Sequence, residues 1–194
     1  KRAHALGHPI VIDPVGVSGS SYRREKCLEL MKIIHPTCIR GNYSEIQALL
    51  HNCGTVTGVD AAEDALVEAE ETDLPELMKQ YAKENQMILV ASGEADLITD
   101  GSCVYRCHNG SPMMARITGS GCMSTVMLGA FLSAENSVES AVACCAFTGI
   151  AGELAAKETT AQKRGTMTFR NWFIDAVSLM TPEQLEHGTN VDWF

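Results

Sequence analysis

A glycine-rich junction at residues 119–122 carries the strongest chemical signal in the sequence. In "RITGSGCMSTVMLGAFL" an extended segment passes into an apolar helical one, and Gly119, Ser120, Gly121 and Cys122 stand at the change. Glycines often end strands and begin helices, so a purely structural role is one interpretation. The chemical alternative is an anion hole, because the first N–H groups of a helix bind anions well. Cys122 would then lie at the positive end of the helix dipole, which favours a thiolate.

A carboxylate ends the first apolar run. In "PIVIDPVGVSGSS" the β-branched residues are followed by Asp13 and Pro14, which is typical of a buried strand that runs into a loop. Asp13 is therefore a candidate ligand of Mg²⁺, either directly or through water. The alternative is an Asp-Pro turn with a solvated carboxylate, and the residues alone leave both interpretations open.

The second apolar run ends in an arginine and is followed by a glutamate. In "IRGNYSEI", Asn42 and Glu45 have the spacing of a helix capping box, which is a sufficient structural reason for both. Arg40 beside them adds a functional interpretation, because an arginine and a glutamate together serve a phosphate and its metal. A third strand end, in "ASGEADLITDG", places Ser92 and Gly93 at a tight turn. That turn needs only its glycine, but the hydroxyl and amides there could line a phosphate.

Composition limits the classes of partner. The chain of 194 residues has a formal charge of −9, from 24 acidic and 15 basic residues. It has no basic stripe interleaved with aromatic residues, so we expect no nucleic-acid partner. A phosphate would need a local site or a bridging metal. We find no signal peptide and expect no apolar segment of membrane length, which predicts a cytoplasmic protein with no membrane partner.

The cysteines have no spacing that completes a metal site. Cys103 and Cys107 are the nearest pair, and no second pair accompanies them. Most of the others lie in apolar runs such as "AVACCAFTGI", where a thiol behaves as a small hydrophobic group. We therefore expect reduced cysteines. The eight are Cys27, Cys38, Cys53, Cys103, Cys107, Cys122, Cys144 and Cys145.

Strands that alternate with helices predict an α/β fold with a mainly parallel sheet. Strands are expected at 9–13, 37–41 and 86–92, with a hairpin around residues 100–101. Helices are expected at 21–34, 42–50, 60–85 with a break before Pro75, 121–134, 137–158 and 168–180. Ligands of such folds bind at the carboxyl ends of the strands, where Asp13, Arg40 and Ser92 are predicted to converge.

Four stretches in this order resemble hydroxyethylthiazole kinase of the ribokinase-like superfamily. They are "VIDPVG", "IRGNYSEI", "ASGEADLITDG" and "RITGSGCMSTVMLGAFL", with "GIAGELAA" further on. The resemblance implies one three-layer αβα domain over residues 1–194 that phosphorylates the hydroxyl of 5-(2-hydroxyethyl)-4-methylthiazole with ATP and Mg²⁺. It also implies a homotrimer with sites at the subunit interfaces.

The same resemblance implies a role for each candidate residue. Asp13 and Glu45 would manage Mg²⁺ and the phosphates. Arg40 and Ser92 would contact ATP, and Ser92 would replace a usual threonine. In the junction at 119–122, Gly119 would border the thiazole and the anion hole, and Cys122 would face the substrate hydroxyl. Either Cys122 or a neighbouring water would then take the proton of the alcohol.

The family chain has an N-terminal region that supplies part of the thiazole pocket, so the domain over 1–194 is expected to be truncated at its N-terminus. Two other functions remain open from the residues. One is a kinase for another small alcohol, or a hydrate dehydratase, of the same fold; such relatives carry an aspartate where this chain has Cys122. The other is a non-catalytic nucleotide-binding subunit.

Overall fold

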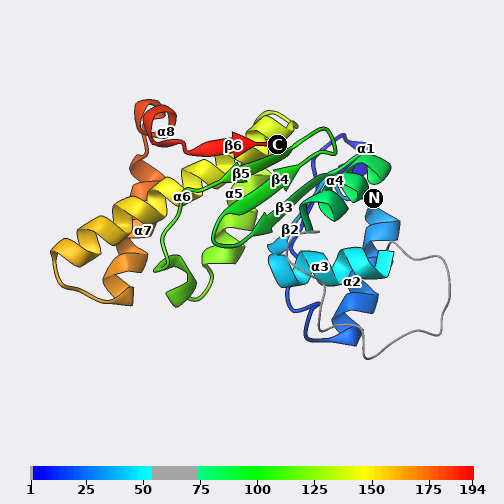
Figure 1. Cartoon of the computed structure of the whole chain (residues 1–194), viewed down its shortest axis with the longest axis horizontal. Helices are drawn as coiled ribbons and strands as arrows, with labels where there is room; N and C mark the ends of the chain where they lie inside the picture. Colours follow the sequence, from blue (N-terminus) through cyan, green and yellow to red (C-terminus); the bar gives the residue numbers. More distant parts are fainter. Residues whose placement is uncertain (1, 54–73) are drawn as a thin grey trace.

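A six-stranded sheet lies between two groups of helices in the computed structural model, which describes residues 2–53 and 74–194 (Figure 1). The strands are β1 (Val11–Ile12), β2 (Cys38–Asn42), β3 (Ile88–Ser92), β4 (Asp96–Thr99), β5 (Val104–Cys107) and β6 (Val191–Trp193). The helices are α1 (Arg2–Ala5), α2 (Ser21–Ile34), α3 (Tyr43–Cys53), α4 (Leu74–Asn85), α5 (Ser120–Ala134), α6 (Val138–Ala161), α7 (Thr166–Leu179) and α8 (Pro182–Gly188). A 3-10 turn, Met114–Arg116, precedes α5.

The sheet is mixed, which corrects the expectation of a mainly parallel one. Strands β1, β2 and β3 are parallel to one another, whereas β4, β5 and β6 each run antiparallel to the strand before them. The order β1-β2-β3-β4-β5-β6 follows the chain. Two short connections explain why β4 and β5 reverse direction, because a turn at Gly93 or at Gly101 is too short for a parallel crossover. The expected hairpin around residues 100–101 is confirmed.

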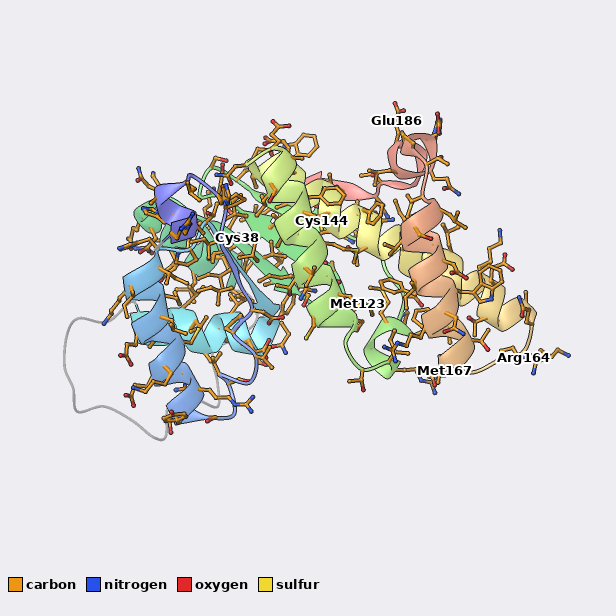
Figure 2. All side chains as sticks on the ribbon, turned by 180° about the vertical axis from the view of Figure 1, so that it is seen from behind. Cys38, Met123, Cys144, Arg164, Met167 and Glu186 are labelled. Carbon is orange, nitrogen blue, oxygen red and sulfur yellow. The ribbon has the colours of Figure 1, made fainter. Side chains whose placement is uncertain are left out.

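Alternate residues of the strands face different helices, which makes the fold a three-layer αβα arrangement. On β3, Leu89 and Ala91 pack with α2, α3 and α4 in one core, and Ile88 and Val90 pack with α5 and α6 in another. This is the two-residue period of a strand buried on both faces. Seen from behind in Figure 2, α5 crosses the sheet and α6 and α7 lie beside it. The expected α/β class with helices on both faces of the sheet is confirmed.

Helix α6 is the apolar centre of the second layer. It is long and apolar enough to cross a membrane by length and composition, which corrects the expectation that no segment reaches membrane length. In the structure 67% of its most apolar window is buried, because the sheet, α5 and α7 surround it. Phe169 and Phe173 of α7 pack on Ala151 and Ala155 of α6. The burial is that of a core helix.

The other predicted elements differ from the structure mainly at their ends. Residues 60–73 of the predicted acidic helix lie outside the described residues, and its remainder is α4. Helix α8 and strand β6 were not predicted, although Thr181, Pro182 and Gln184 form a capping box with proline at the first turn. That pattern is a readable helix start, and it follows the predicted end of α7 by one residue.

Candidate active site

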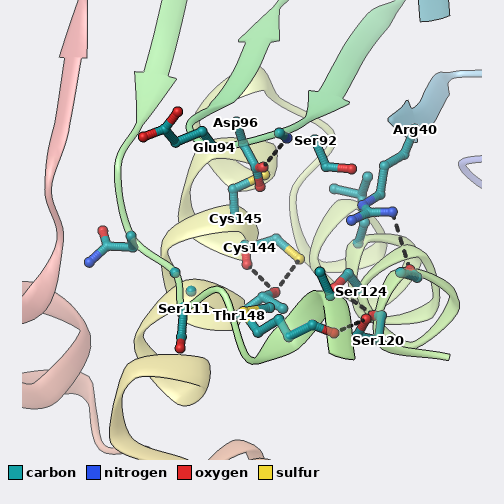
Figure 3. A pocket seen from close by; sticks show the side chains of 18 of the residues that line it. Arg40, Ser92, Glu94, Asp96, Ser111, Ser120, Ser124, Cys144, Cys145 and Thr148 are labelled. Carbon is teal, nitrogen blue, oxygen red and sulfur yellow. Dashed lines mark hydrogen bonds between the residues drawn. The ribbon is translucent and has the colours of Figure 1, made fainter. Parts of the chain in front are cut away.

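A cavity of about 730 Å³ lies where β2 and β3 end, between α5, α6 and the loop at 109–112 (Figure 3). Arg40 and Ser120 stand on one side of it, and Ser111 stands opposite. Four of the predicted residues line this cavity, from three separate parts of the chain: Arg40, Ser92, Ser120 and Gly121. Of the three residues predicted to converge at the strand ends, Arg40 and Ser92 line the cavity and Asp13 does not.

Arg40 is the one basic residue among the described residues that line the cavity. Its side chain is largely buried, with 9% of the residue exposed. Nη1 donates to the main-chain oxygen of Gly121 at 3.2 Å and to Oγ1 of Thr125 at 3.4 Å. Among the described residues no carboxylate forms an ion pair with it. A buried guanidinium without a carboxylate partner has N–H groups left for an anion.

The turn after β3 is held from both sides. Oγ of Ser92 donates to the Gly41 oxygen at 3.3 Å, and the Gly93 N–H donates to Oδ1 of Asp96 at 3.2 Å. The Tyr43 ring covers Gly93 so closely that a Cβ there would lie 2.7 Å from the ring. Glycine is therefore required at 93 for close approach. The turn presents Ser92 and its amides to the cavity in a fixed position.

Helix α5 begins at the cavity, as the sequence predicts. Gly119 precedes the helix with φ of 93°, which favours glycine, and its oxygen accepts the N–H of Met123. Oγ of Ser120 donates to the Met114 oxygen at 2.9 Å. The first N–H groups of the helix have no intrahelical partner, and Ser120 and Gly121 line the cavity. The geometry is that of a helix N-terminus open to an anion.

Two members of the predicted anion hole, Gly119 and Cys122, are not among the residues that line the cavity. Cys122 does lie in the first turn of α5, as predicted, and its side chain is exposed. Val126, one turn further along the same face of the helix, is 75% exposed. Cys122 therefore belongs to an open apolar surface beside the cavity, not to the buried core.

Glu45 makes the hydrogen bonds expected if Asn42 and Glu45 form a helix capping box. Its Oε2 accepts the N–H of Asn42 at 3.0 Å, and Oδ1 of Asn42 accepts the N–H of Glu45 at 2.8 Å. Oε1 also accepts the N–H of Gly16 at 2.8 Å, which ties the loop after β1 to the start of α3. Capping and a ligand role are compatible here, because each carboxylate oxygen keeps a further acceptor site.

Asp13 and Arg40 are linked through the side chain of Thr125. Its Oδ2 accepts the hydroxyl proton of Thr125 at 2.9 Å, and Thr125 is also the partner of Arg40. Neither Asp13 nor Glu45 lines the cavity. Within residues 2–53 and 74–194 no group of three or more His, Cys, Asp or Glu side chains could hold a metal. The site is thus not an all-protein metal cage.

Sequence reasoning missed two features of the cavity wall. Asp96 lines the cavity, and burial raises the pKa of its carboxyl, while the Arg40 charge, the Gly93 N–H and the Cys145 side chain lower it. The loop at 109–112 forms the other wall, where Oε1 of Glu153 accepts the Gly110 N–H at 2.8 Å. Asp96 lies in the stretch "ASGEADLITDG", where only its burial distinguishes it from a solvated turn residue.

The cysteines agree with the expectation of reduced thiols. Every cysteine whose side chain is described is free, and Cys38, Cys107, Cys144 and Cys145 belong to one core cluster. Burial raises the pKa of Cys107 to about 12 and that of Cys144 to about 11. These thiols stay protonated at neutral pH and act as apolar core groups.

Comparison with known proteins identifies the family. The model described as the hydroxyethylthiazole kinase family matches residues 1–183. Proteins named hydroxyethylthiazole kinase are similar along nearly the whole chain. The one from Clostridium acetobutylicum is 35% identical, over 99% of this chain and 71% of its own length. The one from Desulforudis audaxviator is 36% identical, over 99% of this chain and 67% of its own length.

A solved structure gives the same result. The hydroxyethylthiazole kinase protein from Pyrococcus horikoshii OT3 superimposes with a TM-score of 0.81 at 25% identity, covering 99% of this chain and 68% of that chain. The helix start at 119–122 and the strand-end arginine thus lie within a matched kinase fold. The matches favour the thiazole kinase interpretation over the other two functions. This chain belongs to the hydroxyethylthiazole kinase family, whose members are phosphotransferases.

Proposed function

We propose that this chain catalyses ATP-dependent phosphorylation of the hydroxyl group of 5-(2-hydroxyethyl)-4-methylthiazole for thiamin salvage. The observation that carries the proposal is the position of Arg40, a buried guanidinium beside the open N-terminus of α5 in a cavity at the strand ends. Phosphoryl transfer needs positioning and charge stabilisation more than covalent chemistry, and an arginine with helix amides supplies both.

The protein's groups divide into three tasks. Arg40 and Ser92 contact the phosphates of ATP from the strand ends. The N–H groups at the start of α5 hold the transferring phosphoryl group, and Gly119 borders the thiazole. Cys122, exposed in the first turn of the helix, accepts the proton of the substrate alcohol directly or through a water.

The residues present fit a divalent cation, and we propose Mg²⁺. Oδ1 of Asp13 has no hydrogen bond among the described residues, while Oδ2 is fixed by Thr125. Glu45 keeps one acceptor site on each oxygen beside its backbone bonds. Mg²⁺ is usually held by one or two carboxylates, waters and substrate phosphates, so a protein cage is not needed. When bound, it neutralises phosphate charge, which lets an acidic protein accept ATP.

We further propose a cytoplasmic homotrimer with its sites at subunit interfaces. The support is the exposed apolar surface on α5, where Val126 stands one helical turn from Cys122. A neighbouring subunit that packs on Val126 would cover the exposed side of the Cys122 thiol. Sedimentation velocity at micromolar concentration tests this, and a monomer that turns over the thiazole alcohol would contradict it.

The test of the activity is ATP turnover with and without the thiazole alcohol, with the phosphorylated product identified by mass spectrometry. We expect turnover that depends on the alcohol and on Mg²⁺. A pyrimidine alcohol and a sugar serve as matched acceptor controls. Equal turnover of those acceptors would point to another small-alcohol kinase, and ATP binding without turnover of any acceptor would point to a non-catalytic subunit.

A further inference from the structure

The hydroxyl of Thr125 stands between the two charged groups of the site. Nη1 of Arg40 donates to Oγ1 of Thr125 at 3.4 Å, and that oxygen donates its single proton to Oδ2 of Asp13 at 2.9 Å. The Gly121 oxygen, 3.1 Å from the same hydroxyl, is an alternative acceptor, but it already accepts from Arg40 at 3.2 Å. A charged carboxylate at the shorter distance is the better acceptor.

The arrangement keeps opposite charges apart in a place where they would otherwise pair. Asp13 and Arg40 share Thr125 as a partner, and among the described residues neither forms an ion pair with the other or with a third side chain. A buried guanidinium and a nearby carboxylate attract each other strongly at low dielectric. A direct pair would use up the donors and acceptors that a phosphate and a cation need.

We propose that Thr125 is a positioning residue that prevents a direct Asp13–Arg40 ion pair and so keeps Arg40 free for nucleotide phosphate. The hydroxyl satisfies one oxygen of Asp13 and one proton of Nη1 without neutralising either charge. Its position is fixed by α5, on the helical turn that follows Gly121. The inference rests on the proposed function, since it assigns ATP phosphate as the ligand of Arg40.

The test begins with metal-free ATP binding by calorimetry for wild type, Thr125→Val and Thr125→Ser. Valine has the shape of threonine but lacks the hydrogen bonds that hold the Asp13 carboxylate and the Arg40 guanidinium, so both side chains become free to turn toward each other and pair. In Thr125→Val an Arg40 that is paired with Asp13 no longer donates to the phosphate of ATP. We expect a loss of affinity on the order of 10- to 100-fold, which is the usual effect of losing a hydrogen bond to a charged group. Thr125→Ser keeps the hydroxyl and should bind within about threefold of wild type.

The decisive variant is the double substitution Thr125→Val with Asp13→Asn. Removing the carboxylate that captures Arg40 should restore metal-free ATP affinity to that of Asp13→Asn alone. A merely structural role for Thr125 predicts no such rescue, so an additive loss in the double variant would overturn the inference. Full affinity in Thr125→Val would also overturn it. Failure of wild type to bind ATP even with Mg²⁺ present would instead contradict the proposed function.

Discussion

Arg40 and Gly121 are 81 residues apart in sequence, and Nη1 of the arginine donates to the glycine's main-chain oxygen at 3.2 Å. This bond joins the end of β2 to the first turn of α5. The cation at the strand end and the amides at the helix start therefore face one cavity as a rigid unit. An anion that enters meets both at once, which is the arrangement that phosphoryl transfer requires.

Glu45→Gln should weaken Mg²⁺-dependent ATP binding and also lower stability. The amide places a donor where Oε2 accepts the Asn42 N–H, so one capping bond is lost at a cost of about 0.5–2 kcal/mol. Calorimetry with and without Mg²⁺ and urea unfolding measure the two effects separately.

Asn42→Ala is the matched control for that variant. It removes the cap on the Glu45 N–H but leaves the Glu45 carboxylate in place. We expect a similar loss of stability with Mg²⁺-dependent binding retained. If Glu45→Gln also retained binding at the wild-type level, Glu45 would be a capping residue only.

The Cys122 series separates base catalysis from packing. Cys122→Asp should keep activity, because a carboxylate at the helix start can accept the alcohol's proton. Cys122→Ser should be weaker, and Cys122→Ala should lose about 10²–10⁴-fold in kcat with ATP binding preserved. Because the side chain is exposed, all three should unfold within about 0.5 kcal/mol of wild type. Full turnover in Cys122→Ala would remove the thiol from the mechanism.

Asp96→Asn should change stability in a pH-dependent way. Burial raises the pKa of Asp96 above its ordinary value of 3.8, so the folded state holds the proton more tightly than the unfolded chain. The contribution of this group to stability is fully present below 3.8 and is lost as pH rises through the raised value. The variant should therefore be more stable than wild type at neutral pH, by a margin that shrinks on acidification.

Urea unfolding of both proteins between pH 4 and pH 8 measures this margin. Glu94→Gln, an exposed carboxylate at the same turn, is the control and should give a margin close to zero throughout. If the stability gained by Asp96→Asn over wild type instead increased as the pH fell, the raised pKa of Asp96 would be contradicted.

Glu153→Ala should raise the KM for ATP about tenfold, with kcat little changed, by releasing the loop at 109–112 from α6. Oε1 of Glu153 accepts from Nδ2 of Asn109 at 3.1 Å and from the Gly110 N–H at 2.8 Å. Because the variant loses two hydrogen bonds to a charged group, we expect a rise in KM of about tenfold. Lys157→Ala, exposed one turn further along α6, should leave KM unchanged and is the matched control.

Gly149→Ala tests the same loop from the other side. An added Cβ would lie 2.5 Å from the Asn109 backbone, so the loop must move away from α6. We expect at least the KM effect of Glu153→Ala. Normal KM values in both variants would show that the loop does not shape the ATP site.

The sequence predicts the strand-end positions well because local patterns decide them. Short β-branched runs that end at Asp13, Arg40 and Ser92 locate the ends of β1, β2 and β3 closely, and a glycine pair locates the start of α5. These signals depend on neighbouring residues, which one sequence contains in full.

The pairing of β6 with β5 and the cavity wall depend on contacts between distant parts of the chain. The bonds from Glu153 to residues 109 and 110 span 44 and 43 positions, and Thr125 meets Asp13 across 112. Glu153 and Thr125 are ordinary residues for the surface of a helix, so their spacing gives no sign of their partners. For Glu45 the sequence leaves a cap and a ligand role open for another reason: the structure shows the capping bonds, and these bonds do not exclude a ligand role.

The strand order has a consequence for how the protein is made. Each strand of the sheet pairs with the strand that precedes it in the chain. A polypeptide that emerges from the ribosome can therefore extend the sheet one strand at a time, without waiting for a distant strand to insert between two others. Helices α5 and α6, which cover one face and complete the cavity, are synthesised only after β5. We expect the nascent sheet to expose its apolar face, including Val90 and Ile98, until translation reaches α6.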